Sequence, residues 1–351
     1  MVAASPVGRR LEIEGGFEEV NDWLYEHQMT DGLPVIPPTE EKVAALLKGT
    51  KRDPAEEIGL IPPRWGVATV EAVAANGVMA GCRPEYLPVL LTAVEAMLAP
   101  EFNLYGIQAT THPLGPGILV NGPVAARLDI NGKNNCFGQG WRANATIGRA
   151  LRLVLLNIGG GLPGKGDKST AGWPGKFTMC FAENEEALPA GWDPLHVERG
   201  FRRDQSTVTI IGAGGYHNSA DLWSTTAEGV LRTIAYGMAA KSSHLGEGGD
   251  PLCALCPEHA AIIAGGGFSK AQVKEFLYQH ARAPLIIFSD EIQESFRASG
   301  SGRAVDDQGR LMIADQAEEI TVIVAGGPGP HSAFIPSWGR TVKSVTRLIG
   351  D

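Results

Sequence analysis

The sequence predicts an α/β fold with mixed sheets, in which strands run into glycine-rich turns that lead to helices. Glycine accounts for 45 of the 351 residues, which is about twice its usual share. The glycines gather in short clusters that mostly follow apolar runs, such as 159–161 and 265–267. Strands that end in such turns are typical of α/β proteins, whose active sites form there.

Helices are predicted where apolar residues recur every three or four positions. The clearest in the first half is 84–98, whose leucines keep this spacing. Thr39 and Ser269 have side chains suited to cap the helices that follow them. In chain order the predicted helices are 17–28, one that starts at Thr39, 69–79, 84–98, 144–157, 224–240 and 270–282.

Strands are predicted where short apolar runs are bounded by turn residues. The most convincing is 320–325 (ITVIVA), which ends in the turn GGPGPHS. Proline-containing links at 31–38 and 58–65 are expected to be extended. The other predicted strands are 104–111, 117–121, 176–182, 208–212, 259–264 and 285–289.

These patterns suggest three parts. We expect an N-terminal helical arm with extended links over 1–66, an α/β subdomain over 67–200 and a second α/β subdomain over 201–351. The last two share a layout of strand, glycine-rich turn and helix, without a clear sequence repeat.

The composition argues against several classes of protein. The net charge of -9 argues against nucleic acid as a partner, because that binding rests on basic surface. No apolar run approaches the ~20 residues that span a bilayer, and the N-terminus lacks the apolar region of a secretory signal. Five cysteines without framework spacing favour reduced thiols. We expect a cytoplasmic homo-oligomer that binds neither nucleic acid nor membrane.

A basic stretch, Asn131–Lys176, stands out against this acidic background. It reads as a glycine-rich loop, a helix and a second glycine-rich loop, with Asp167 as its one acid. The stretch predicts a preformed pocket for a small anion, bound by backbone N–H groups near Asn144 with Arg142 as a charged clamp. The alternative is a helix with solvated arginines between two flexible loops. Its seven basic residues are Lys133, Arg142, Arg149, Arg152, Lys165, Lys168 and Lys176.

This stretch matches neither of the common phosphate-binding loops. The order G-x-x-x-x-G-K-[ST] is absent, and Gly138 and Gly140 lack the third glycine of a dinucleotide fingerprint. There is also no G-x-S-x-G motif of a serine hydrolase.

Polar residues at predicted strand ends are candidates for proton transfer, because such ends collect functional groups in α/β proteins. His112 and Glu183 lie at strand ends, and His217 follows the strand 208–212 in a glycine-rich turn. Asn121 and His331 have similar surroundings and are candidates for substrate binding. The alternative for each of them is a turn residue that bonds its own backbone.

The cysteines allow two other kinds of site, a metal site and a reactive thiol. Cys253 and Cys256 form a C-x-x-C pair that can hold zinc or act as a redox pair, but small core residues are the favoured interpretation. Cys136 would be a nucleophile if the nearby cations lowered its pKa. A metal-dependent enzyme would use some of His112, Glu183, His217, His244, Cys253, Cys256 and His259.

Five segments carry a resemblance to a known family: RANATIGRALRLVLLNIGG, AENEE, PLHVERGF, CPEHAAIIAGGGFSK and IVAGGPGPHSAFIPSWG. Over roughly residues 100–340 the chain resembles a little-characterised bacterial family associated with UGSC-motif proteins, where U is selenocysteine or the cysteine that replaces it. This sequence contains no Gly-Ser-Cys, so it does not supply that thiol or selenol chemistry itself. The resemblance allows a role beside a redox (seleno)protein.

Taken together, the residues predict a cytoplasmic enzyme of lyase or hydrolase type. It would act by acid/base chemistry on a small carboxylate, sulfonate or phosphate, without an organic cofactor. Arg142, Asn144, Asn121, Lys165 and His331 would bind this substrate. The alternatives are a non-catalytic subunit that needs a partner chain and a metal-dependent enzyme.

Overall fold

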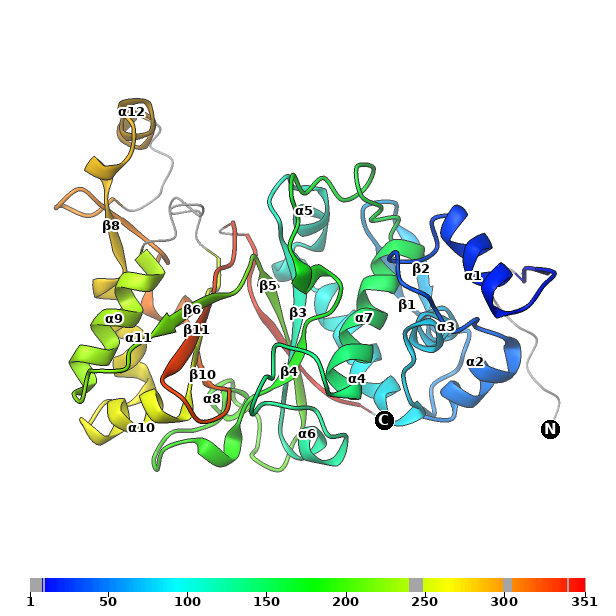
Figure 1. Ribbon diagram of the computed structural model, residues 1–351, viewed down its shortest axis with the longest axis horizontal. Coiled ribbons are helices and arrows are strands. Elements are labelled where there is room, and N and C mark those ends of the chain that lie inside the picture. The colour runs from blue at the N-terminus through cyan, green and yellow to red at the C-terminus, as the bar shows by residue number, and fades with distance from the viewer. Residues whose placement is uncertain (1–7, 9, 240–248, 299–304, 340, 351) are drawn as a thin grey trace.

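Two four-stranded β-sheets pack face to face at the centre of the protein, and helices cover their outer faces (Figure 1). The computed structural model describes residues 8, 10–239, 249–298, 305–339 and 341–350. Its helices and mixed sheets confirm the predicted α/β class.

The first sheet is built mainly from antiparallel pairs. In spatial order it consists of β12 (Val345–Leu348), β5 (Thr207–Ala213), β3 (Gly115–Asn121) and β4 (Cys180–Ala182). β3 and β5 form its centre and pair antiparallel from Gly115 opposite Ala213 to Asn121 opposite Thr207. β4 runs parallel to β3, and β12 runs antiparallel to β5.

The second sheet is also mixed. In spatial order it consists of β10 (Thr321–Val324), β7 (Leu252–Leu255), β11 (His331–Ile335) and β6 (His217–Ala220). β10 and β7 are parallel, and β11 is antiparallel to both of its neighbours.

Alternate residues along each strand divide the core into three layers, because successive side chains point to opposite faces of a sheet. In β3, Ile118 and Val120 pack against helices, whereas Leu119 faces the other sheet. In β10, Val322 faces helices and Ile323 faces the first sheet. The molecule therefore has four layers, in the order helices, sheet, sheet, helices.

Helices cover both outer faces (Figure 1). On the first sheet these are α4 (Leu87–Met97) and α7 (Arg142–Asn157), and α3 (Val70–Ala80) packs against these two helices. On the second sheet they are α9 (Ala227–Ala239), α10 (Pro257–Gly265) and α11 (Lys270–His280). The predicted cap is confirmed at Ser269, whose hydroxyl accepts a hydrogen bond from the Gln272 N–H at the start of α11.

Shorter elements surround these layers. An N-terminal group lies beyond α3, and a small hairpin with one helix projects from the other end of the molecule (Figure 1). The hairpin strands β8 (Arg282–Pro284) and β9 (Arg310–Met312), with helix α12 (Asp290–Ala298), carry a small core of their own. The remaining helices and strands are α1 (Phe17–Glu26), α2 (Glu40–Leu47), β1 (Glu57–Ile61), β2 (Gly66–Thr69), α5 (Leu104–Ala109), α6 (Pro123–Arg127) and α8 (Leu195–Glu198). The 3-10 turns are Pro84–Tyr86, Pro100–Phe102, Pro174–Lys176, Glu185–Ala187, Leu285–Ile287 and Ala317–Glu319.

Several predicted elements are wrong in type. The predicted strands 104–111 and 259–264 are the helices α5 and α10, and 285–289 is mostly a 3-10 turn. Short apolar runs do not distinguish a strand from a buried helix. Local capping decides in favour of helix at both sites: the Asn103 side chain accepts from Gly106 N–H, and Cys256 precedes Pro257 at the first turn of α10.

Two further expectations need correction. The link 58–65 is not simply extended but contributes to the antiparallel hairpin of β1 and β2. The expected boundary at residue 200 does not separate the two sheets, because β5 and β12 complete the first sheet with β3 and β4. The chain therefore passes from the first sheet to the second after β5 and returns at β12.

Among the described residues, no single helix is long and apolar enough to cross a membrane. By length and composition alone, the bent pair Pro84–Met97 and Pro100–Ala109 would qualify.

Candidate anion-binding pocket

Most cations of Asn131–Lys176 form ion pairs or hydrogen bonds with nearby carboxylates and carbonyl oxygens. Lys133 pairs with Glu186 at 2.7 Å on the surface, and Lys168 donates to the Gly164 carbonyl at 2.7 Å. Arg149 holds Asp31 with two hydrogen bonds of 2.7 and 2.8 Å. These cations therefore already have acceptors within the fold.

Helix α7 begins two residues before the predicted Asn144. The N-cap position belongs to Trp141, and Asn144 is buried in the first turn. Its side chain accepts from Asn131 N–H at 2.8 Å and donates to the Asn131 carbonyl at 2.9 Å. Asn144 therefore fixes the preceding loop, and its amide is fully engaged in that contact.

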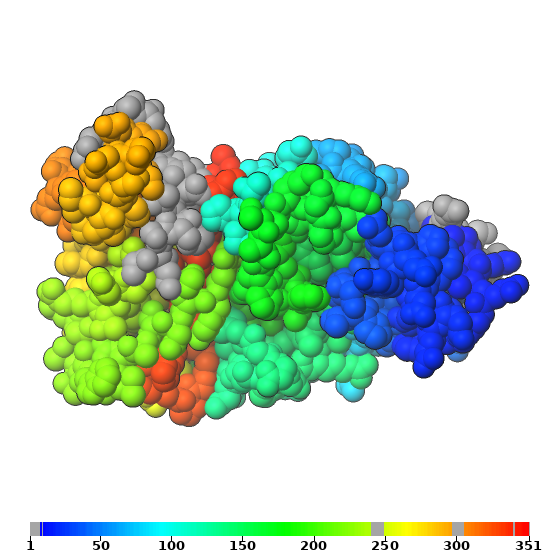
Figure 2. All heavy atoms as spheres, turned by 45° about the horizontal axis from the view of Figure 1, so that its top comes forward, coloured from blue at the N-terminus to red at the C-terminus, as the bar shows by residue number. Residues whose placement is uncertain are grey.

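A pocket of about 860 Å³ lies between the end of α1, the second half of α7 and the loop 161–177. In Figure 2 the N-terminal residues (blue) lie against the green part of the chain, which includes that loop. Much of the lining is apolar and includes Tyr25, Leu156, Leu162, Trp173 and Phe177. The charged residues that line it are Glu26, Asp31, Arg152, Asp167 and Lys176.

Arg152 is the cation with the fewest partners in this pocket. Its side chain is 9% exposed, and its Nε donates to the Lys176 carbonyl at 2.7 Å. The nearest acid is Asp167, whose Oδ2 lies 4.0 Å from Nη1. Burial lowers the pKa of Arg152 from its ordinary value, although Asp167 and Asp31 oppose this effect.

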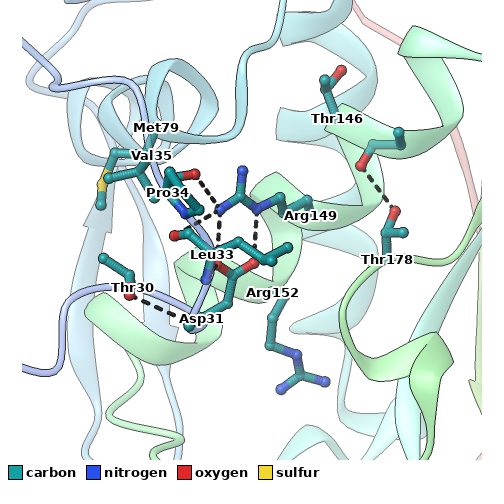
Figure 3. A network of polar contacts seen from close by, with 12 residues as sticks. Thr30, Asp31, Leu33, Pro34, Val35, Met79, Thr146, Arg149, Arg152 and Thr178 are labelled. Atoms are coloured by element: carbon teal, nitrogen blue, oxygen red, sulfur yellow. Dashed lines mark hydrogen bonds and ion pairs between the residues drawn. The ribbon is translucent and has the colours of Figure 1, made fainter. Parts of the chain in front are cut away.

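Arg149 and Arg152 lie three residues apart on α7, but their guanidinium groups make different contacts. Figure 3 shows Arg149 held by Asp31 and by the backbone of Leu33 and Pro34, while the Arg152 guanidinium points away from that network. Among the described residues, the terminal N–H groups of Arg152 have no hydrogen-bond partner. Such an incompletely satisfied guanidinium in a pocket wall is suited to bind a carboxylate, sulfonate or phosphate.

Lys176 lies beside Arg152 and is held by two oxygen atoms. Its Nζ lies 2.5 Å from Asp167 Oδ2 and donates to Ser169 Oγ at 2.6 Å. Burial lowers the pKa of Lys176, and the charge of Arg152 adds to this effect. Burial disfavours ionisation of Asp167, but its hydrogen bonds to Lys176 and Ser169 outweigh this and lower its pKa.

Gly115 at the start of β3 leaves room for both cations. A Cβ atom at this position would lie 3.2 Å from Arg152 Nη2 and 3.4 Å from Lys176 Cγ. A methyl group there would press on the Arg152 guanidinium and would touch the aliphatic part of Lys176, so glycine at this position leaves room for the Arg152 side chain.

The structure places the other predicted binding residues outside this pocket or at its rim. Arg142 is exposed and donates to the Gly81 carbonyl at 3.3 Å. Lys165 donates to Gln28, a residue of the lining, at 2.7 Å. His331 lies on β11, where its Nδ1 accepts a hydrogen bond from Asn218. These residues do not converge on one point.

The three predicted proton-transfer residues also lie apart. The His112 ring stacks on Trp338, and its backbone carbonyl accepts a hydrogen bond from Ser169. The His217 ring stacks on Phe334 in the second sheet. Glu183 is buried with Asn121, whose amide donates to it at 2.6 Å. Of the predicted site residues, Glu183 and Asn121 are therefore in direct contact, and the His112 carbonyl contacts Ser169 in the pocket wall.

A metal site finds little support in the described part of the chain. Its residues contain no group of three or more His, Cys, Asp or Glu side chains suited to hold a metal ion; His244 lies outside the described residues. Cys253 is a core residue, as favoured from the sequence, and Cys256 caps α10 with its sulfur. Burial raises the pKa of Cys136 to about 11, which disfavours a thiolate nucleophile.

The sequence predicts only some of the residues that line the pocket. Arg152 lies off the apolar stripe of α7, which suggested a solvated side chain. Most of α7 is buried nevertheless, because α3, α4 and the first sheet enclose it. The local excess of basic residues indicates the stretch that contributes to this pocket, but it does not single out Arg152 from the other arginines.

Comparison of the chain with protein-family models, curated proteins and solved structures finds no match.

Proposed function

We propose that the protein is an enzyme that binds a small organic anion in the pocket beside Arg152. The observation that carries this proposal is the buried Arg152 guanidinium, whose terminal N–H groups have no hydrogen-bond partner among the described residues. A ligand carboxylate, sulfonate or phosphate would supply the missing acceptors in charge-assisted hydrogen bonds.

The rest of the lining supports an anion with an apolar body. Trp173, Phe177 and Leu156 offer ring and aliphatic surface, and apolar walls with a few fixed polar groups are typical of small-molecule sites. Lys176 and Asp167 lie next to Arg152 and form a proton-donating and proton-accepting pair. This favours acid/base chemistry of the lyase or hydrolase type. All five cysteines are free thiols, which favours a cytoplasmic location.

Binding of aromatic anions tests this proposal. We expect phenyllactate, benzoate or phenyl phosphate to raise the melting temperature; at a hundredfold excess over its Kd, one bound ligand adds about 2.7 kcal/mol of stability. Arg152→Met should abolish the shift, because methionine keeps the bulk of the side chain and removes its donors.

Arg142→Met is the matched control, since Arg142 lies on the same helix but is exposed. It should bind these anions as the unchanged protein does. If none of the anions stabilises the protein, or if both variants bind equally well, the proposal fails.

A further inference from the structure

Lys176 is the one lysine among the described residues that line the pocket, and its amine is held in place. Its side chain is 13% exposed, whereas that of Lys133 in the same stretch is 55% exposed. Asp167 and Ser169 fix Nζ from two directions at 2.5 and 2.6 Å. The backbone carbonyl of the same residue accepts a hydrogen bond from Arg152 Nε, which places the amine and the guanidinium side by side in the pocket wall.

Two features distinguish this amine from a structural ion pair. A second cation lies beside it, and both line a cavity large enough for an organic ligand. A buried amine next to another cation is the arrangement that activates lysine as a nucleophile. The lowered pKa of Lys176, due first to burial, agrees with this geometry.

We infer that Lys176 forms a Schiff base with an oxo acid that carries an apolar or aromatic group, while Arg152 holds the carboxylate of that acid. This inference rests on the proposed function, because it assigns the anion bound at Arg152 to one chemical class. It also makes the enzyme a lyase.

The step balances with groups that the pocket contains. Asp167 takes a proton from the Lys176 ammonium group, and the amine lone pair attacks the substrate carbonyl carbon while the π electrons of the C=O bond move to oxygen. A proton then moves from the nitrogen to that oxygen, which gives a carbinolamine. Asp167 returns its proton to the hydroxyl group, water leaves, and a C=N⁺ bond forms.

When such an acid carries a hydroxyl group on the second carbon from the C=N⁺ carbon, Asp167 takes the hydroxyl proton and that carbon leaves as an aldehyde. The electron pair of the broken carbon–carbon bond forms the enamine double bond, and the C=N⁺ π electrons move to nitrogen. Protonation of the resulting enamine carbon and addition of water reverse the first steps and release the amine. Ser169 acts as a positioning residue, because its hydroxyl accepts a hydrogen bond from Nζ and donates to the His112 carbonyl.

Reductive trapping tests the inference on the full chain. Phenylpyruvate and sodium cyanoborohydride should give one stable adduct per chain, with the mass of the acid less one oxygen atom. Peptide mapping of the unchanged protein should place it on Lys176, which needs no variant to fold. Lys176→Arg should remove this adduct, whereas Lys165→Arg, at the rim, should keep it.

Phenyllactate separates this inference from the proposed function, because it has the carboxylate and the ring but no ketone. If phenyllactate binds in an Arg152-dependent manner and phenylpyruvate gives no adduct on Lys176, the Schiff base is excluded and anion binding stands. If phenyllactate also fails to bind, the proposed function fails. Adducts spread over exposed lysines at equal rates would overturn the inference as well. Arg152→Met should slow trapping on Lys176 by about tenfold or more, because it removes charge-assisted hydrogen bonds to the carboxylate.

Discussion

Glu183 illustrates how a carboxylate at a strand end serves the fold. It follows β4 directly and is 4% exposed. Its Oε2 accepts hydrogen bonds from the Asn121 amide and from Leu195 N–H, and its Oε1 lies 3.6 Å from Lys270 Nζ. Burial raises its pKa, although Lys270 opposes this. One side chain thereby connects β3, α8 and α11.

Removal of this carboxylate should destabilise the protein strongly. Glu183→Ala leaves three buried donors with fewer partners, and we expect it to lower the free energy of unfolding by about 3 kcal/mol. Urea denaturation measures the change. Glu186→Ala, which breaks an exposed ion pair with Lys133, should cost less than about 1 kcal/mol. Equal effects of the two substitutions would contradict a structural role for Glu183.

At the residue scale, the sequence predicts what depends on near neighbours. Ser269 is predictable as a cap because it directly precedes the helix, and the Gln272 N–H that it binds is only three residues away. Arg149 and Asp31 are 118 residues apart, and no local pattern indicates that they meet. The contacts of Arg152 could not be predicted for the same reason. Asp31 binds Arg149 and not Arg152, and the sequence does not reveal this pairing.

At the scale of elements, Asp221 connects the end of β6 to helix α9 through hydrogen bonds. One carboxylate oxygen accepts from Trp223 and Ser224 N–H, and the other accepts from the Thr233 hydroxyl on α9 at 2.6 Å. Burial disfavours its ionisation, but these hydrogen bonds outweigh that effect and lower its pKa to about 2.

This contact should make stability depend on pH in the acid range. Because the folded pKa lies below that of the unfolded chain, the contribution is complete above pH ~4 and is lost as the pH falls towards 2. Asp221→Asn should therefore be less stable than the unchanged protein by about 2 kcal/mol at pH 6. The difference should shrink below pH ~4. Denaturant unfolding at several pH values measures it, and a difference that stays constant with pH would refute the assignment.

Helix and strand positions were predicted best where the pattern is long. The helices at 84–98 and 270–282 and the strand at 320–325 lie close to the observed α4, α11 and β10. The short apolar run of α10 was assigned as a strand, because Cys256 and Pro257 at its start, rather than its periodicity, favour a helix. The four-residue strand β7 was not predicted.

At the scale of the whole molecule, the two sheets form one cooperative core. The layer between them includes Leu119 and Phe181 from the first sheet and Ile323 and Ile335 from the second. The sequence suggested a boundary at residue 200 because its two halves share a layout. Strand pairing between distant segments, which sequence patterns do not reveal, instead places β5 and β12 beside β3.

A fragment that ends before β5 should not fold. Residues 67–200 would lack the central strand of the first sheet and half of the layer between the sheets, so β3 would present an unpaired edge. We expect no cooperative unfolding transition by circular dichroism, whereas the full chain should show one. A fragment with a sharp transition would restore the predicted boundary.

The late return of the chain to the first sheet also matters during translation. β5 leaves the ribosome well before β12, and β12 covers the edge of β5 that β3 does not. Until residues 345–348 have been made, the nascent protein exposes unpaired backbone groups along β5, and such an edge is prone to pair with other chains. Slower growth at low temperature or chaperone binding during synthesis would protect this edge and should increase the yield of folded protein.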